Sequence, residues 1–454
     1  MATAKLAQWA VNLQFSQLPS SVTQAANRSF YNWAGCAIGG STHPATLKAS
    51  TALRPFFGQP TSSLLGRSAS SQDGKADAQH AALINGIASH VHDYDDTHLE
   101  TIIHPTGPVA SALLAQAEAL ETPTSGKDFL LALVAGIEAE CKLGLTVWPK
   151  HYDLGWHITS TVGSIGAAVA VGKLLKLDEE KMGHAISIAA TQVTGLREQF
   201  GSDTKSFHIG RSAQNGLLAA ALARNGYTGS LHALEAKRGW VNVVGAGSNR
   251  LEEMVGSLGT IWEVEKNSFK PFPCGIVVHP SIDGCIQLHD EMRERGLVAN
   301  EDTIESVKAR VHPLVLELTG KKTPIDGLQA KFSVYHGAAV GLVMGKAGPA
   351  QYEDPLVISQ EIVGVRERFE ATADGNLMAD EADILLTMKD GTVLRKHVEH
   401  AIGSLEAPMT DEQLQTKFKD QSMPVLGRNG TAAASKAFRS MEGAESVAKI
   451  APSI

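Results

Sequence analysis

A helical spacing of apolar residues recurs through roughly the first 265 residues and constrains the fold more than any other feature of the chain. Leu6, Trp9, Ala10 and Leu13 follow the i, i+3, i+4, i+7 pattern of an amphipathic helix. No longer period recurs, which argues against a solenoid. We therefore expect a large helical domain over residues 1–266. Similar patterns, several rich in Ala and Gly, are found at 22–37, 78–89, 108–120, 127–145, 160–175, 179–194 and 212–225.

The pattern changes after about Asn267. Val307, Ala309 and Val311 alternate with polar residues, as in a half-buried strand, and residues 383–388 and 392–398 flank an Asp-Gly turn, as in a hairpin. Residues 401–454 return to polar helical sequence, punctuated by Pro408 and Gly427. The predicted fold class is mainly α, with a smaller α+β domain over 267–400 and a C-terminal segment that returns to the helical domain.

Composition excludes several classes of function. The chain has 454 residues, 43% of them apolar, and contains no run of about 18 hydrophobic residues, so no membrane partner is expected. Met1 leads directly into an amphipathic pattern, which makes the cytoplasm the expected location. A net charge of −8 gives no basic surface for nucleic acid. Four scattered cysteines suggest neither a zinc site nor a disulfide framework, and each is expected to be a small buried hydrophobic residue.

Imidazoles and carboxylates are concentrated in residues 90–104, directly before an apolar helical stretch. Burying such groups costs several kcal/mol unless each is paired or used, so this run is a candidate site. His104 precedes a predicted helix start at which free N–H groups attract anions, although capping or packing explains His104 alone equally well. His157 lies before another predicted helix, and Lys205 and His208 lie near a third; for Lys205 alone, a solvated side chain is the simpler interpretation.

A metal centre is the rival interpretation of the first cluster. Enough nitrogen and oxygen ligands are present in His90, His92, Asp93, Asp95, Asp96 and His98. On a helix, however, His90 and Asp93 would share one face while His92 and Asp95 shared another, so the ligands would diverge. The sequence therefore predicts no metal.

Several motifs, in this order, resemble the MmgE/PrpD family, which includes 2-methylcitrate dehydratase, cis-aconitate decarboxylase and iminodisuccinate epimerase. The resemblance covers most of the chain and implies a large helical domain, a smaller α+β lid domain, a homodimer, a small anionic carboxylate substrate and no cofactor. It is carried by Asp93-Tyr94-Asp95-Asp96-Thr97 with His104-Pro105, by Gly155-Trp156-His157, by Thr204-Lys205-Ser206-Phe207-His208-Ile209-Gly210, and by Pro273-Cys274-Gly275 with His279.

The same resemblance implies roles for individual residues. The residues implied to be catalytic are His104, His157, Lys205, Asp93 and, on the weakest match, Tyr335. Those implied to bind substrate are Thr97, His279 and His208. Because six residues separate Thr97 from His104 and no Trp follows Thr97, the run looks closer to fungal decarboxylase-like members than to methylcitrate dehydratases.

The resemblance implies acid/base chemistry on a small carboxylic acid more firmly than it implies one particular reaction. The expected activity is a cofactor-free lyase that decarboxylates cis-aconitate or an alkylated relative by acid/base catalysis. An alkylcitrate dehydratase and an epimerase of an aminodicarboxylate need the same groups in another order. A catalytically inactive binding protein is disfavoured, because every implied position keeps a titratable or hydroxyl side chain.

Overall fold

The computed structural model describes residues 1–68 and 73–451 and divides them into two compact units. Unit 1 comprises the described residues of 1–91 and 95–267 together with those from Glu412 onward; unit 2 comprises His92–Tyr94 and Ser268–Asp411. The sequence analysis divides the chain at residues 266 and 400, and the two units divide it at Asn267 and Asp411. The assignment of His92–Tyr94 to unit 2 has no counterpart in the sequence analysis.

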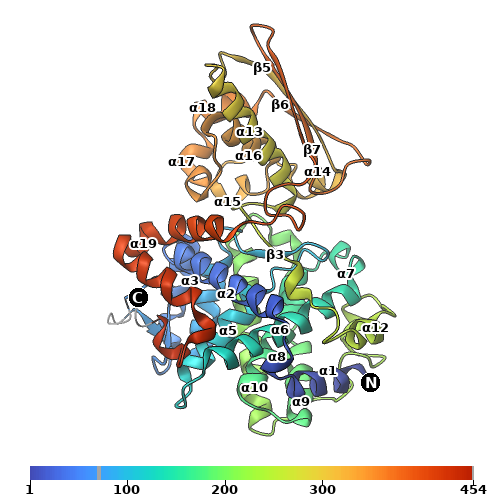
Figure 1. Cartoon of the computed structure of the whole chain (residues 1–454). Helices are drawn as coiled ribbons and strands as arrows, with labels where there is room; N and C mark the ends of the chain where they lie inside the picture. Colours follow the sequence, from blue (N-terminus) through green and yellow to red (C-terminus); the bar gives the residue numbers. More distant parts are fainter. Residues whose placement is uncertain (69–72, 452–454) are drawn as a thin grey trace. The chain divides into compact units, whose positions relative to one another are not determined.

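Unit 1 is built from helices, with only short strands. The α8 helix packs against both α6 and α10 (Figure 1). The α4 helix packs against α5 and α10. Ala and Gly line these contacts, and their small size lets the helices approach closely. The helices are α1 (Ala2–Asn12), α2 (Ser20–Gly40), α3 (Pro44–Leu53), α4 (Ala78–His90), α5 (Thr106–Ala119), α6 (Gly126–Val147), α7 (Lys150–Asp153), α8 (Ile158–Leu174), α9 (Glu179–Ala190), α10 (Asp203–Arg224), α11 (Trp240–Val243), α12 (Leu251–Gly256) and α19 (Asp411–Arg439), and the short strands are β1 (Ser62–Ser63), β2 (Lys75–Ala76) and β3 (Asp96–His98).

Aromatic side chains hold the C-terminal segment against α2. The Phe30 ring lies 5.6 Å from Phe438 and 4.8 Å from Phe129 of α6, measured between ring centroids. Tyr31 stacks on Phe418 at 4.5 Å. Such pairs add about 0.5–1.5 kcal/mol each beyond the area that they bury. At Gly427, φ is 66°, which breaks α19 at the punctuation seen in the sequence.

Unit 2 is an α+β structure. Its four-stranded sheet has the order β6-β5-β7-β8, in which β5 and β6 are parallel and the other pairs antiparallel. The predicted strand and hairpin are confirmed as β5, β7 and β8, with Ala309 opposite Ile384, while β6 was not predicted. The elements are α13 (His279–Glu294), α14 (Pro313–Thr319), α15 (Gly327–Ala330), α16 (Val334–Met344), α17 (Asp354–Val357), α18 (Gln360–Arg366), β4 (Asn267–Phe269, at the unit boundary), β5 (Ile304–Val311), β6 (Phe369–Ala373), β7 (Ala382–Met388) and β8 (Val393–Val398).

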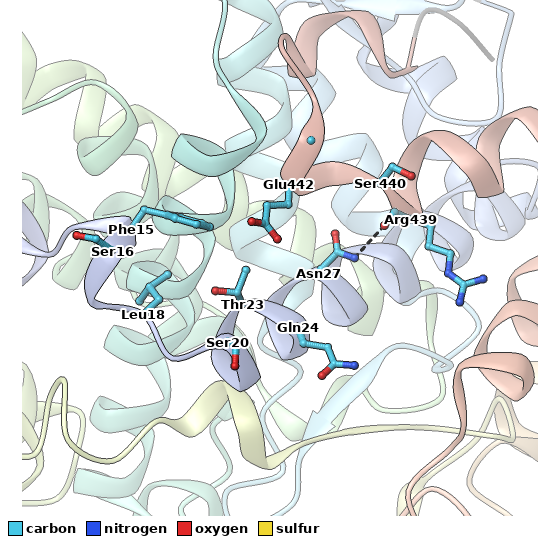
Figure 2. Close-up of a pocket in the computed structure, with 11 residues that line it drawn as sticks. Phe15, Ser16, Leu18, Ser20, Thr23, Gln24, Asn27, Arg439, Ser440 and Glu442 are labelled. Carbon is cyan, nitrogen blue, oxygen red and sulfur yellow. Dashed lines mark hydrogen bonds between the residues drawn. The ribbon is translucent and has the colours of Figure 1, made fainter.

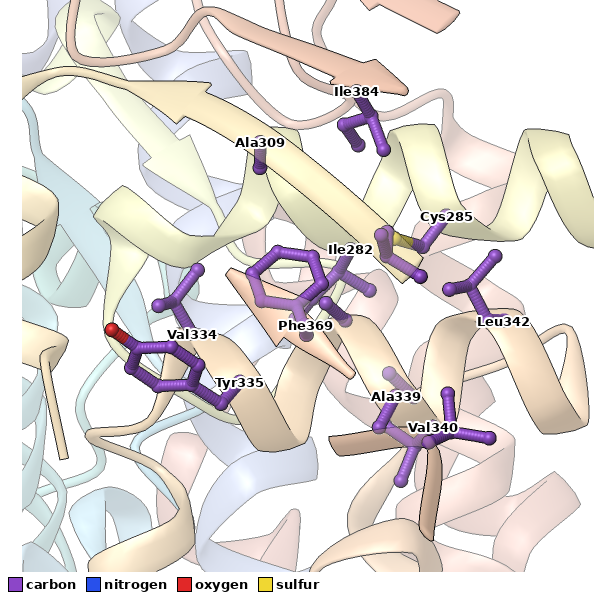
Figure 3. Packing of buried hydrophobic residues seen from close by; sticks show 14 of the residues in the cluster. Ile282, Cys285, Ala309, Val334, Tyr335, Ala339, Val340, Leu342, Phe369 and Ile384 are labelled. Atoms are coloured by element: carbon purple, nitrogen blue, oxygen red, sulfur yellow. The ribbon is translucent and has the colours of Figure 1, made fainter. Parts of the chain in front are cut away.

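The core of unit 2 lies between its sheet and the helices α13 and α16. Ile282 and Cys285 of α13 meet Leu342 of α16 there, and Ile384 projects from β7 (Figure 3). All four cysteines of the chain are buried, as the sequence predicted. None of the described helices combines the length and apolar character needed to span a bilayer.

Candidate active site

Two helices of unit 1 approach closely because glycines face each other. A Cβ atom on Gly86 of α4 would lie 2.6 Å from the Cα atom of Gly210 of α10, which only two glycines permit. His90 lies one turn further along α4, and Lys205 lies in the opening turns of α10. The glycine contact therefore brings these two side chains within reach of each other.

Lys205, His90 and Asp95 form a buried chain of polar contacts. The Lys205 Nζ atom is 2.6 Å from His90 Nε2, and His90 Nδ1 is 2.8 Å from Asp95 Oδ2. The exposed fractions are 7% for Lys205, 2% for His90 and 0% for Asp95. A lysine and an aspartate at such depth need compensating partners, and the imidazole between them contacts both.

His104 lies next to this chain, with its ring centroid 4.7 Å from that of His90. Its Nδ1 atom is 2.8 Å from the Asp96 carbonyl oxygen, 3.3 Å from Thr97 Oγ1 and 3.5 Å from Asp95 Oδ1. Because a carbonyl oxygen only accepts hydrogen bonds, Nδ1 carries a hydrogen. The preceding turn is strained, since Ile102 has a φ of 58°.

His157 and His208 form a directly paired set of imidazoles, 3.0 Å apart between their Nδ1 atoms. One nitrogen must donate and the other accept, so both rings cannot be protonated at these atoms. Burial and the positive charge of Lys205 lower the pKa of His208 to about 4 and hold the pKa of His157 well below its usual value. Both rings are therefore neutral near pH 7.

A loop before α10 places the aromatic ring of Phe200 next to His157 and Lys205. Phe200 lies edge-on to His157 at 5.1 Å, and its ring centroid is 5.3 Å from Lys205 Nζ. Gly195 has a φ of 104°, and a Cβ atom there would meet Ser160 Oγ at 2.0 Å, so only glycine fits. Arg197 stacks over Tyr152 at 3.9 Å and anchors the loop.

Three of the predicted residues lie in unit 2. Asp93 forms a buried ion pair with Lys270 at 3.2 Å and has a φ of 50°. His279 begins α13 and packs edge-on against Phe272 at 5.4 Å. Tyr335 meets Phe369 edge-on at 5.9 Å within the core (Figure 3).

The structure thus brings together five predicted residues of unit 1: Thr97, His104, His157, Lys205 and His208. Sequence reasoning missed His90 as the partner of Lys205 and Asp95 as the partner of His90, as well as Phe200 and the Lys270 partner of Asp93. The five-residue spacing of His90 and Asp95 was visible in the sequence. The contact of Lys270 with Asp93, which is 177 positions away, carried no local signal.

Other polar groups of the 90–104 run lie outside this cluster. His98 contacts Thr101 at 2.7 Å and Glu263 at 3.0 Å, and Glu263 also pairs with Lys142 at 2.5 Å. His90, Asp95 and His104 offer ligand atoms within 4.8 Å of one another. However, both ring nitrogens of His90 already contact Asp95 or Lys205, and a lysine ammonium repels a cation. This arrangement suits proton chemistry better than metal ligation.

A surface pocket of 620 Å³ on unit 1 involves none of these residues (Figure 2). Its side chains include both Arg439 and Glu442, and Asn27 donates a hydrogen bond to the Arg439 carbonyl at 2.9 Å. It contains no imidazole and no lysine, so it lacks the groups for acid/base work on a carboxylate. The lining residues are Phe15, Ser16, Leu18, Ser20, Thr23, Gln24, Asn27, Arg439, Ser440, Glu442 and Gly443.

The helical unit with its imidazole cluster and the α+β unit match two family models. The MmgE/PrpD N-terminal domain matches residues 4–252, and the MmgE/PrpD C-terminal domain matches residues 272–442. The chain belongs to the MmgE/PrpD family.

Individual relatives are named for two lyase reactions. Cis-aconitate decarboxylase of Aspergillus terreus is 27% identical over 92% of this chain and 88% of its own length. The human protein of the same name is 26% identical over 95% of this chain and 90% of its own length. The 2-methylcitrate dehydratase of Escherichia coli is 25% identical over 68% of each chain. The chain is therefore similar along most of its length to enzymes that remove carbon dioxide or water.

Proposed function

We propose that the protein is a lyase for a small tricarboxylate and that it decarboxylates cis-aconitate or an alkylated cis-aconitate-like acid. The observation that carries this proposal is a buried Lys205 accompanied by four imidazoles, His90, His104, His157 and His208. A lysine cation holds a carboxylate by charge-assisted hydrogen bonds, and imidazoles supply proton donors and acceptors. The decarboxylases that align over more than nine-tenths of this chain support the choice of substrate class.

The surroundings of the imidazoles differ, and that difference suggests separate roles. His104 lies 3.5 Å from the Asp95 carboxylate, which stabilises a positively charged ring there. Its Nδ1 hydrogen is directed at the Asp96 carbonyl, which leaves Nε2 as the atom that delivers a proton. His157 and His208 are neutral at pH 7 because of burial and Lys205. We therefore assign His104 as the general acid.

The chemistry of a β,γ-unsaturated acid defines what these groups must do. The carboxylate on the methylene carbon leaves as carbon dioxide, and its electron pair forms the new terminal double bond. The original alkene pair then resides on the carbon beside another carboxylate, where one proton must be added. Lys205 would stabilise the charge on that carboxylate, and His104 would supply the proton.

Dehydration of a 2-methylcitrate-type acid is the second candidate. The neutral His157–His208 pair favours it, because a neutral imidazole can remove a proton next to a carboxylate. His104 would then assist departure of the hydroxyl group. The shorter alignment with the dehydratase makes this candidate the weaker of the two.

Proton NMR in D2O separates the two reactions. Chelator-treated protein is incubated separately with cis-aconitate and 2-methylcitrate. We expect vinylidene signals from cis-aconitate alone, with one deuterium on the methylene carbon next to a carboxylate. We expect the chelator to leave turnover unchanged. An alkene product from 2-methylcitrate alone would support the dehydratase. No reaction with either acid would contradict decarboxylation of cis-aconitate itself and would restrict the proposal to its alkylated relatives.

The role of His104 is tested in the same assay. His104→Gln should lower turnover by roughly 10²–10⁴ while the protein stays folded, because a general acid contributes about that factor. His232→Gln is the matched control, since His232 is 50% exposed and pairs with Glu235 on the surface. Near-normal turnover of the His104 variant would remove this residue from the mechanism.

A further inference from the structure

The contact between Lys205 and His90 restricts where hydrogens can be. A lysine ammonium has three donors and no acceptor, so His90 Nε2, at 2.6 Å, must present its lone pair. The hydrogen of a neutral His90 is then on Nδ1, directed at the Asp95 carboxylate at 2.8 Å. The Nδ1 hydrogen of His90 and one ammonium hydrogen of Lys205 therefore each have an acceptor. The order of contacts is Asp95 carboxylate, His90 Nδ1–H, His90 Nε2, Lys205 ammonium.

The alternative places the shared proton on His90 and leaves Lys205 as a neutral amine. An isolated lysine is about four pKa units more basic than histidine, and burial disfavours both cations. The Phe200 ring, 5.3 Å from Nζ, adds a favourable contact for an ammonium. The proton therefore belongs on the lysine.

We propose that His90 and Asp95 are positioning residues that hold Lys205 as an oriented ammonium for a substrate carboxylate. Asp95 selects the Nδ1–H tautomer of His90, and that tautomer gives Lys205 an acceptor on one side. The substrate half of this statement rests on the proposed function. The tautomer half is a property of the protein alone and does not depend on which reaction it catalyses.

The remaining charged and titratable groups around Lys205 in unit 1 fit this assignment. His104 lies against His90 at 4.7 Å, and His157 lies 6.0 Å from His90, measured between ring centroids. His208 is on α10 together with Lys205. The neutral His157–His208 pair brings no second positive charge, and Asp95 is the carboxylate that contacts both His90 and His104. The ring of His90 is thus fixed by packing as well as by its two polar contacts.

A matched pair of substitutions separates the two contacts of His90. His90→Gln places an amide oxygen near the former Nε2 position and keeps an acceptor for Lys205. His90→Asn places an amide N–H near the former Nδ1 position and keeps a donor for Asp95. With propane-1,2,3-tricarboxylate as the probe in calorimetric titration, we expect the Kd to rise no more than about threefold for the Gln variant and at least about tenfold for the Asn variant.

Nitrogen-15 NMR of histidine-labelled protein at pH 7 tests the tautomer directly. Whichever His90 variant folds identifies the His90 signals by their loss. We expect the Nδ1–H pattern in the unsubstituted protein and its loss in Asp95→Asn. An Nε2–H or doubly protonated His90 would overturn the proposal, as would equal weakening of probe binding by both His90 variants. Because the NMR measurement needs no substrate, a failed activity assay leaves it interpretable.

Discussion

The buried ion pair between Lys142 and Glu263 allows a quantitative test of how unit 1 tolerates charge. The two side chains are 2% and 1% exposed and lie 2.5 Å apart. Glu263→Gln preserves shape but leaves the lysine charge without its carboxylate. Breaking a buried pair from one side costs about 3–5 kcal/mol. Glu138 offers partial compensation, because burial raises its pKa to about 7 and Lys142 favours its charged form, so we expect the lower half of that range.

Calorimetric melting at one scan rate measures this loss. In a domain larger than about 250 residues, each kcal/mol shifts Tm by about 2 °C at most, so a fall of roughly 5–8 °C is expected. Lys5 and Glu252 provide the control, since they are also close, at 2.6 Å, but are both 55% exposed. Glu252→Gln should shift Tm by less than about 2 °C, because exposed pairs contribute about 0–1 kcal/mol.

A double variant decides whether the cost arises from the isolated charge. Lys142→Met combined with Glu263→Gln removes both charges and should recover at least half of the lost Tm. If the double variant melts below the single Glu263 variant, burial of an uncompensated lysine is not the cause. A shift in the single variant no larger than that of the exposed control would refute the reasoning altogether.

Three further outcomes follow from the same contacts. Burial opposes ionisation of Glu263, but hydrogen bonds from His98, Lys142 and Lys266 outweigh it and lower its pKa to about 2. The stability that the charged Glu263 contributes is therefore present above the ordinary pKa of 4.5 and is lost as pH falls from there toward 2. Melting at a series of pH values will detect this loss, and a flat profile will exclude it. Lys205→Met should raise KM by roughly 10- to 150-fold through loss of a charged hydrogen bond, and an unchanged KM would count against carboxylate binding. Tyr335→Phe keeps the ring packing and should leave Tm nearly unchanged while lowering turnover by roughly 10²–10⁴ if its hydroxyl group transfers a proton, so normal turnover would make Tyr335 a core residue only.

Periodicity predicted the elements well but not all of their limits. The expected helix over 78–89 is α4 (Ala78–His90), and the expected hairpin is β7 with β8. The helix expected at 212–225 begins at Asp203, because Lys205 and His208 interrupt the apolar pattern where their side chains face the buried cluster. Buried polar residues stand there in place of the hydrophobic residues that a periodicity argument requires.

Local sequence also could not indicate which polar residues pair. His98 and His104 look equivalent in the run, yet His98 joins Glu263, which follows 165 positions later, while His104 joins the cluster around Lys205. The pairing of His90 with Lys205 depends on the packing of α4 against α10 at Gly86 and Gly210. Motifs named several candidate residues, but only tertiary packing determines their hydrogen-bond partners.

The strained turn before His104 has a consequence for how this chain tolerates change. A branched residue at a φ of 58° costs about 1–3 kcal/mol, and Ile102 is held there because the His98 amide donates to Ile103 and the His98 ring contacts Thr101. Glycine at this position would release that energy without altering any imidazole. A variant stabilised in this way tolerates further mutations that would otherwise unfold the protein. Directed evolution that starts from it can therefore reach a wider range of substrate preferences.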